Sequence, residues 1–149
     1  MKYSNFMEVT FKALSVNEGF ARVAVAGFCL PLNPSIDELG DIKTAVSEAV
    51  TNSVVHAYPK GNGMVTIRCE LDGDEVKIIV KDSGIGIKDI EKAREPFFTT
   101  KPEEERSGMG FAVMESFMDK VEVKPNESSG LVVIMYKKIN SIVARVENA

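Results

Sequence analysis

Residues 76–86 read VKIIVKDSGIG, and this stretch decides the fold. Its apolar side chains alternate up to position 80, which predicts a strand with one buried face. Residues 64–71 alternate in the same way, and Asp72-Gly73 between the two segments is typical of a hairpin turn. The sequence therefore predicts an antiparallel hairpin of residues 64–71 and 75–81, followed at once by a turn that contains two glycines.

Two helices are expected before the hairpin, because two capping boxes occur there. In residues 15–18 and 35–38, a glutamate stands three positions after a serine, so each pair can satisfy free amides at a helix start. The first helix is expected to end at Pro31 and the second near Ala57. The apolar residues expected to face the core are Phe20, Val23, Ala24, Gly27 and Phe28 in the first helix, and Ile36, Leu39, Ile42, Val46 and Val50 in the second.

The rest of the pattern gives the fold class. Further strands are predicted at 6–14, 121–124 and 131–138, and a helix at 109–118. Residues 88–107 are polar and charged, which predicts a long mobile loop. Because strands adjacent in sequence favour antiparallel pairing, we expect an α+β fold. It is a two-layer sandwich with a mixed, mostly antiparallel sheet and helices on one face, formed by a single domain over residues 1–149.

Length and composition exclude several classes of protein. The chain has 149 residues, 44% of them apolar and 27% charged, which is typical of one globular domain. No apolar run is long enough for a membrane span or a secretory signal, so a cytoplasmic protein without a membrane partner is expected. A net charge of -4 argues against direct nucleic-acid binding. Cys29 and Cys69 lack metal-ligand spacing, so we expect buried, reduced thiols.

Polar side chains recur along the second predicted helix. Glu48, Asn52 and His56 are four residues apart and share one helix face. A carboxylate there can accept a substrate proton, and an amide oxygen can hold a hard cation. A solvated polar face is the alternative, and a single histidine near a helix end can equally be structural.

The turn after the hairpin is a second candidate site. Asp82, Gly84 and Gly86 form a D-x-G-x-G pattern, in which the glycines allow close approach to a flat ligand. Asp82 could accept a hydrogen bond from an exocyclic amine. The alternative is an ordinary turn that leaves a strand. The dinucleotide-binding fingerprint is excluded, because no third glycine or alanine stands at position 89.

A third candidate site opens the predicted helix at 109–118. The amides of Gly108, Met109 and Gly110 can bind an anion at the helix start, and Arg106 and Lys101 could meet a terminal phosphate. The alternative is an exposed glycine-rich helix start with ordinary surface charges. The Walker A pattern and the protein-kinase H-R-D signature are absent, so any nucleotide site must be of another type.

Taken in this order along the chain, the three candidate sites resemble the conserved boxes of the ATP-binding superfamily that includes gyrase B, heat-shock chaperones, histidine kinases and MutL. They are the E-x-x-x-N box, the D-x-G-x-G box and the G-x-G box, with a mobile lid at about 90–108 before the last. A narrower resemblance is to the bacterial anti-sigma factor serine kinases. It is carried by SEAVTNSVVHAY (47–58), EPFFTTKPEEERSGMGF (95–111) and VMESFMD (113–119), and it extends from Asn17 to about Lys137.

The resemblance implies a role for each matching residue, with ATP and Mg²⁺ as cofactors. These roles are Glu48 as general base, Asn52 as magnesium ligand, Asp82 as acceptor for the adenine amine, Gly84 and Gly86 in the adenine floor, Gly108, Met109 and Gly110 at the phosphates, Arg106 and Lys101 at the γ-phosphoryl group, and Arg22 in partner docking.

The resemblance also implies an activity and partners. The protein would be a homodimer that holds a sporulation sigma factor inactive and phosphorylates a serine of an anti-anti-sigma protein. The alternatives are a kinase that controls a general stress sigma factor, and a nucleotide-gated sigma-binding protein without kinase activity. Two departures stand out: residues 130–133 lack the last-strand threonine common in the family, and Ser53 replaces a common alanine, with little consequence expected.

Overall fold

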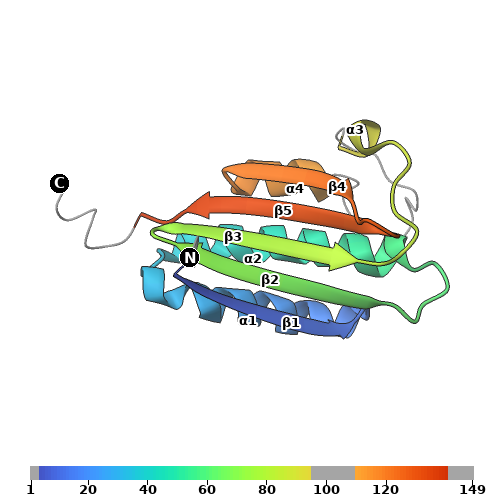
Figure 1. The fold of residues 1–149 in the computed structure, drawn as a ribbon. Coiled ribbons are helices and arrows are strands. Elements are labelled where there is room, and N and C mark those ends of the chain that lie inside the picture. The colour runs from blue at the N-terminus through green and yellow to red at the C-terminus, as the bar shows by residue number, and fades with distance from the viewer. Residues whose placement is uncertain (1–3, 95–109, 141–149) are drawn as a thin grey trace.

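The structure, a computed structural model, describes residues 4–94 and 110–140. Five strands form one sheet in the order β1-β2-β3-β5-β4, and each of the four pairings is antiparallel (Figure 1). The strands are β1 (Asn5–Lys12), β2 (Met64–Asp72), β3 (Glu75–Asp82), β4 (Lys120–Pro125) and β5 (Leu131–Lys138).

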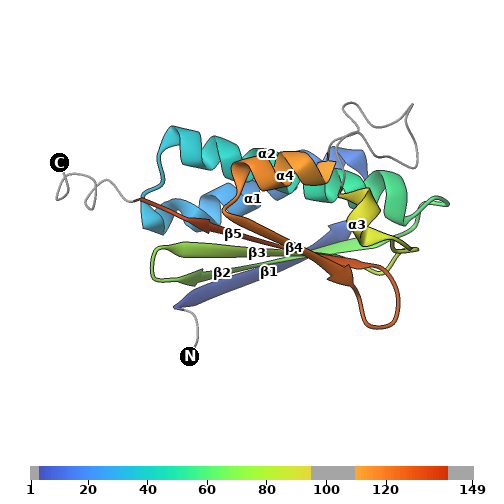
Figure 2. The ribbon, with the colours of Figure 1, turned by 90° about the horizontal axis from the view of Figure 1, so that it is seen from above.

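The helices cover one face of this sheet (Figure 2). They are α1 (Glu18–Cys29), α2 (Ile36–Asn52) and α4 (Gly110–Phe117), with a short α3 (Ile90–Ala93), the 3₁₀ turns η1 (Ser15–Asn17) and η2 (Leu30–Leu32), and a π-helical turn η3 (Ser53–Ala57). The predicted α+β sandwich with helices on one face is confirmed, and its sheet is antiparallel throughout the described strands. None of the described helices is long and apolar enough to cross a bilayer.

The predicted hairpin is confirmed. In the β2–β3 pair, Cys69 lies opposite Ile78 and Asp72 opposite Glu75, and Gly73 adopts a φ of +61° at the turn. The inward side chains of both strands are fully or almost fully buried, so each strand contributes one row to the core. Burying an aliphatic side chain of this size stabilises a fold by roughly 1.5–3 kcal/mol, so two such rows account for the apolar alternation in the sequence.

The capping box of the second helix is also confirmed. The Ser35 amide donates to Glu38 Oε1 at 2.8 Å, and the Glu38 amide donates to Ser35 Oγ at 3.1 Å. The other oxygen of Glu38 accepts the Asn140 amide at 2.9 Å. Next to it, Ile139 is 1% exposed, and its amide donates to Asp74 O at 2.7 Å. One carboxylate therefore joins the start of α2 to the residues that follow β5.

The capping box predicted at Ser15 is wrong. Residues 15–17 form the 3₁₀ turn η1, and no side-chain cap is made there. Helix α1 begins at Glu18, whose carboxylate accepts a hydrogen bond from the Thr51 hydroxyl of α2 instead. The carboxylate of Glu18 therefore joins α1 to α2 through the Thr51 hydroxyl and does not cap its own helix.

The predicted apolar face of α1 is wrong in part. The residues that α1 buries are Ala21, Val25, Ala26 and Cys29, whereas Phe20 and Val23 are 52% and 68% exposed. Small side chains allow the close packing of α1 against α2 and the sheet, and the larger ones lie outside that contact. In the predicted stripe of α2, Ile42, Val46 and Val50 are fully buried, whereas Leu39 is half-buried and Ile36 is 88% exposed.

The predicted loop at 88–107 contains a helical turn at its start. Residues 90–93 form α3, and the Asp89 carboxylate caps it by accepting the Lys92 amide at 3.1 Å. Asx side chains favour helix starts for this reason. Residues 95–107 of the predicted loop lie outside the described residues.

The two cysteines are buried, as predicted, and burial raises both pKa values, that of Cys29 to about 12. We therefore expect neither thiol to react with a disulfide reagent at pH 8 until denaturant is added, because the thiolate is the reactive form. The same raised pKa values predict that the free energy of unfolding falls as pH rises above about 8.5, where unfolded thiols ionise. Rapid labelling of the native protein would contradict the predicted burial.

Candidate functional site

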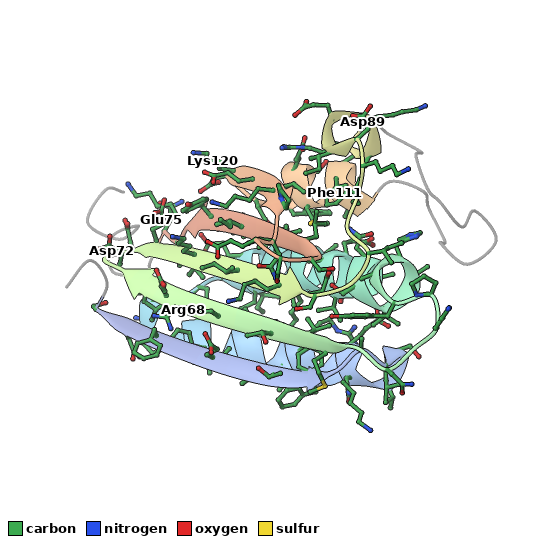
Figure 3. All side chains as sticks on the ribbon, turned by 45° about the vertical axis from the view of Figure 1, so that its right-hand side comes forward. Arg68, Asp72, Glu75, Asp89, Phe111 and Lys120 are labelled. Carbon is green, nitrogen blue, oxygen red and sulfur yellow. The ribbon has the colours of Figure 1, made fainter. Side chains whose placement is uncertain are left out.

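A cavity of about 500 Å³ opens at the end of the sheet where β3 finishes. Figure 3 labels Asp89 before α3 and Phe111 on α4, two of its lining residues, and places Asp72 and Glu75 at the opposite end of the hairpin. The lining comes from α2 and η3 (Asn52, His56, Ala57), from β3 and the segment after it (Asp82, Ile85, Gly86, Ile87, Lys88, Asp89, Lys92, Ala93), and from α4 and β5 (Gly110, Phe111, Leu131).

Asp82 is the buried acid of this cavity, with 6% of its surface exposed. Its Oδ1 accepts the amides of Gly84 at 3.0 Å and Leu131 at 3.2 Å, and its Oδ2 accepts the Ser53 hydroxyl at 3.1 Å. An ionised carboxylate offers about four acceptor positions, of which these bonds use three. The remaining one belongs to Oδ2, so Asp82 can still accept a hydrogen bond from a ligand, as its position at the strand end predicts.

The two glycines after Asp82 serve different purposes. Gly86 lines the cavity and has a φ of +73°, a conformation that favours glycine. Gly84 instead packs against η3, where an added Cβ would lie 2.1 Å from the carbonyl oxygen of Ala57. The Ile85 amide donates to the same oxygen at 2.9 Å. Gly84 is therefore required by the contact between the turn and η3, and it does not line the cavity.

Replacing Gly84 by alanine is expected to destabilise the fold and to weaken ligand binding, because the methyl group would separate the turn from η3. Steric overlap with fixed backbone typically costs roughly 1–3 kcal/mol. The matched control is Gly40→Ala on α2, where a Cβ would meet nothing within 4 Å and should stabilise the helix by about 0.5–1 kcal/mol. Chemical denaturation measures both, and equal effects would contradict the packing role of Gly84.

The polar helix face predicted from sequence is brought to the cavity in part. Asn52 and His56 line it, whereas Glu48 lies one turn earlier on α2, half-buried and outside the lining. The helix widens into the π turn η3 directly after Asn52, and such turns, although rare, are frequently found at functional sites. Asn52 Nδ2 is buried without a hydrogen-bond partner, alone among side-chain atoms of the described residues. A buried amide in this state calls for a ligand or water.

Sequence reasoning predicted the turn between β4 and β5 but missed its contacts with the site. Asn126 Nδ2 donates to Asp82 O at 2.9 Å, and the Ser129 hydroxyl donates to Gly84 O. An added Cβ on Gly130 would lie 2.1 Å from Asp82 O, so this glycine lets the turn contact the end of β3. No local motif marks these residues, since their partners lie more than forty positions away in the chain.

The other predicted site residues divide into three groups. Gly110 lines the cavity at the start of α4, whereas Lys101, Arg106, Gly108 and Met109 lie outside the described residues. Arg22 is on α1, away from the lining, and donates to Ser47 Oγ at 3.0 Å. Within residues 4–94 and 110–140, no group of three or more acidic, histidine or cysteine side chains could hold a metal ion.

Solved structures share this fold. The chain aligns with the RsbU and RsbW domains of a Mycobacterium tuberculosis protein at a TM-score of 0.63 and 15% identity, covering 91% of this chain and 32% of that one. It aligns with the nucleotide-free catalytic domain of the histidine kinase ThkA at a TM-score of 0.56 and 23% identity, covering 91% of this chain and 98% of that one. At these identities the likeness concerns the fold alone.

Sequence relatives are much closer. Residues 13–137 match the family described as the histidine kinase-like ATPase domain. The anti-sigma F factor of Clostridium perfringens is 54% identical over 138 residues, which cover 92% of this chain and 99% of the relative. That of Thermoanaerobacter sp. is 52% identical over 141 residues, covering 95% and 99%. The chain therefore belongs to the histidine kinase-like ATPase domain family and, within it, to the family of the anti-sigma F factors.

Proposed function

We propose that the protein is an ATP-dependent anti-sigma F factor and a serine kinase that phosphorylates an anti-anti-sigma protein. ATP binding follows from membership of the ATPase domain family. The observation that carries the proposal is Asp82, a buried carboxylate with one acceptor position left in the cavity. That acceptor suits the exocyclic amine of adenine, which donates hydrogen bonds.

The rest of the cavity suits a nucleotide of this kind. Its volume of about 500 Å³ lies within the usual range for small-molecule sites. Ile87 and Leu131 supply apolar surface for a base, and Lys88 and Lys92 bring positive charge to the same cavity. In this proposal the base lies against Asp82 and the phosphates extend toward the start of α4, where Gly108, Met109 and Gly110 would supply amides.

Asn52 would hold Mg²⁺ together with phosphate oxygens and water. Mg²⁺ commonly binds through one or two protein ligands and keeps several waters, which suits a site without an acidic cluster among the described residues. The metal ligand would be Oδ1 of Asn52, while its unpaired, buried Nδ2 is a donor that would pair with a phosphate oxygen or a water. The bound ion would neutralise charge on the phosphates.

Glu48 would act as the general base of the transfer. It precedes Asn52 by one helical turn on the same face of α2. As the serine oxygen bonds to the γ-phosphorus, the bond from that phosphorus to the bridging oxygen breaks, ADP leaves, and Glu48 takes the hydroxyl proton. Arg106 and Lys101 would stabilise charge on the transferred group, and residues at about 90–108 would act as the lid.

The proposed partners are a sigma F factor, which the protein would sequester as a homodimer, and the anti-anti-sigma substrate. Arg22 would dock a partner through its guanidinium, which offers several donors beyond the bond to Ser47. Since sigma factors act on RNA polymerase, the protein would work in the cytoplasm.

Incubation with γ-labelled ATP, Mg²⁺ and a candidate anti-anti-sigma protein tests the proposal. We expect label on a serine of that protein, and binding of a sigma F factor that depends on ATP. Sigma binding that depends on ATP, without any transfer, would instead favour a nucleotide-gated binding protein. Tighter binding of a stress sigma factor than of sigma F would favour the stress-response alternative.

A further inference from the structure

We infer that Ser53 is a positioning residue on which the selection of adenine by Asp82 depends. This inference rests on the proposed ATP site and deepens it. Ser53 is 3% exposed at the start of η3, and it does not line the cavity. Its hydroxyl donates to Asp82 Oδ2 at 3.1 Å. It therefore acts on a ligand only through the carboxylate.

The hydrogen bonds of Asp82 show why the hydroxyl matters. Both acceptor positions of Oδ1 are taken by backbone amides, from Gly84 and Leu131. Those two bonds restrain Oδ1, whereas the position of Oδ2 also depends on its own contacts. Among the described residues, the Ser53 hydroxyl is the hydrogen-bond donor to that oxygen. It therefore fixes the direction in which the last acceptor position faces the cavity.

A fixed acceptor discriminates between bases at their six position. Adenine carries an amine there, which can donate a hydrogen bond to Oδ2. Hypoxanthine carries a carbonyl oxygen at the same position, and since this oxygen and the carboxylate are both acceptors, they repel each other. Sites built to hydrogen-bond one ligand group reject analogues that lack it. If the Ser53 hydroxyl is removed, Oδ2 loses its protein donor and is held less firmly, so the contrast between the two bases should shrink.

The test compares Mg-ATP with Mg-inosine triphosphate by calorimetry on wild-type protein, Ser53→Ala and Ser53→Cys. We expect wild-type protein to prefer ATP, and Ser53→Ala to lower that preference about five- to tenfold, mainly through weaker ATP binding. Ser53→Cys should fall between them, because a thiol is a weaker donor. The ratio of the two dissociation constants comes from one preparation, so partial unfolding of a variant does not alter it.

Ser129→Ala is the matched control. It removes another hydroxyl from the same region, one that donates to Gly84 O rather than to Asp82. We expect any loss of affinity in this variant to be equal for both nucleotides. An unchanged ratio in Ser53→Ala, or an equal drop in Ser129→Ala, would overturn the role of Ser53 while ATP binding stands. Failure of wild-type protein to bind either nucleotide would overturn the ATP site itself.

Discussion

Glu48→Gln is expected to slow phosphoryl transfer to serine by about 10²–10⁴-fold, the usual contribution of a general base. Glutamine keeps the size and the hydrogen-bonding length of the side chain but cannot take the proton of the attacking hydroxyl. ATP affinity should change by less than about threefold, because Glu48 lies outside the lining of the cavity. Single-turnover transfer from γ-labelled ATP, with affinity measured separately, distinguishes the two effects.

The matched control for Glu48 is Asp37→Asn, which removes the same charge from the same helix. Asp37 is exposed in the first turn of α2, about 16 Å along the helix axis from Glu48. We expect full transfer activity and at most a small loss of helix stability. Undiminished transfer by Glu48→Gln would remove Glu48 as the base, and equal slowing in both variants would point to a general effect of charge.

Asp82→Asn is expected to weaken ATP binding by at least about 100-fold. The fold should survive, since the amide oxygen can still accept from the Gly84 and Leu131 amides and the Ser53 hydroxyl can rotate to accept from the new amine. The new amine would then face the adenine amine, donor against donor. Losing a hydrogen bond to a buried charged group costs roughly 1.5–3 kcal/mol, and the opposed donors add to it.

Calorimetry with Mg-ATP measures this loss, and Asp72→Asn provides the control. Asp72 is exposed at the end of β2, at the opposite end of the hairpin from the cavity (Figure 3), so its variant should bind ATP like wild-type protein. Thermal unfolding without nucleotide should confirm that Asp82→Asn remains folded. Tight ATP binding by this variant would show that the base does not use the carboxylate.

Sequence patterns predicted the elements whose determinants are local. The alternation in residues 64–71 and 75–81 fixes both strands of the hairpin, and Gly73 supplies the turn conformation between them. The box at Ser35 and Glu38 formed because both partners lie within one helical turn. The D-x-G-x-G pattern placed Asp82 correctly, because a strand end is a local feature.

The errors arose where a distant partner decides the outcome. Glu18 matched a capping box, yet Thr51 of another helix takes its carboxylate. Phe20 and Val23 are large apolar residues of α1, but they are exposed. The close contact of α1 with α2 buries Ala21, Val25 and Cys29 instead. The position of β5 between β3 and β4 depends on pairing across the sheet, which periodicity does not encode.

The same reason explains what was missed in the site. Ser53 looked like a neutral replacement of alanine, because its partner Asp82 is 29 positions away in sequence. Asn126 and Ser129 resemble ordinary turn residues, although they contact the ends of the Asp82–Gly84 segment. A polar residue at a position that is usually apolar, next to a suspected helix-borne site, is the one signal that could have identified Ser53.

Glu38 accepts the Ser35 amide with one carboxylate oxygen and the Asn140 amide with the other. This pair of contacts limits how far the C-terminus can be shortened for crystallisation or fusion. A stop codon before position 139 would delete a core isoleucine and leave one carboxylate oxygen of the α2 cap without its amide. Tolerance of truncation follows burial and backbone bonding rather than nearness to a terminus. Shortened versions should therefore retain Asn140, because its loss would weaken the anchoring of the start of α2. That helix carries Glu48 and Asn52.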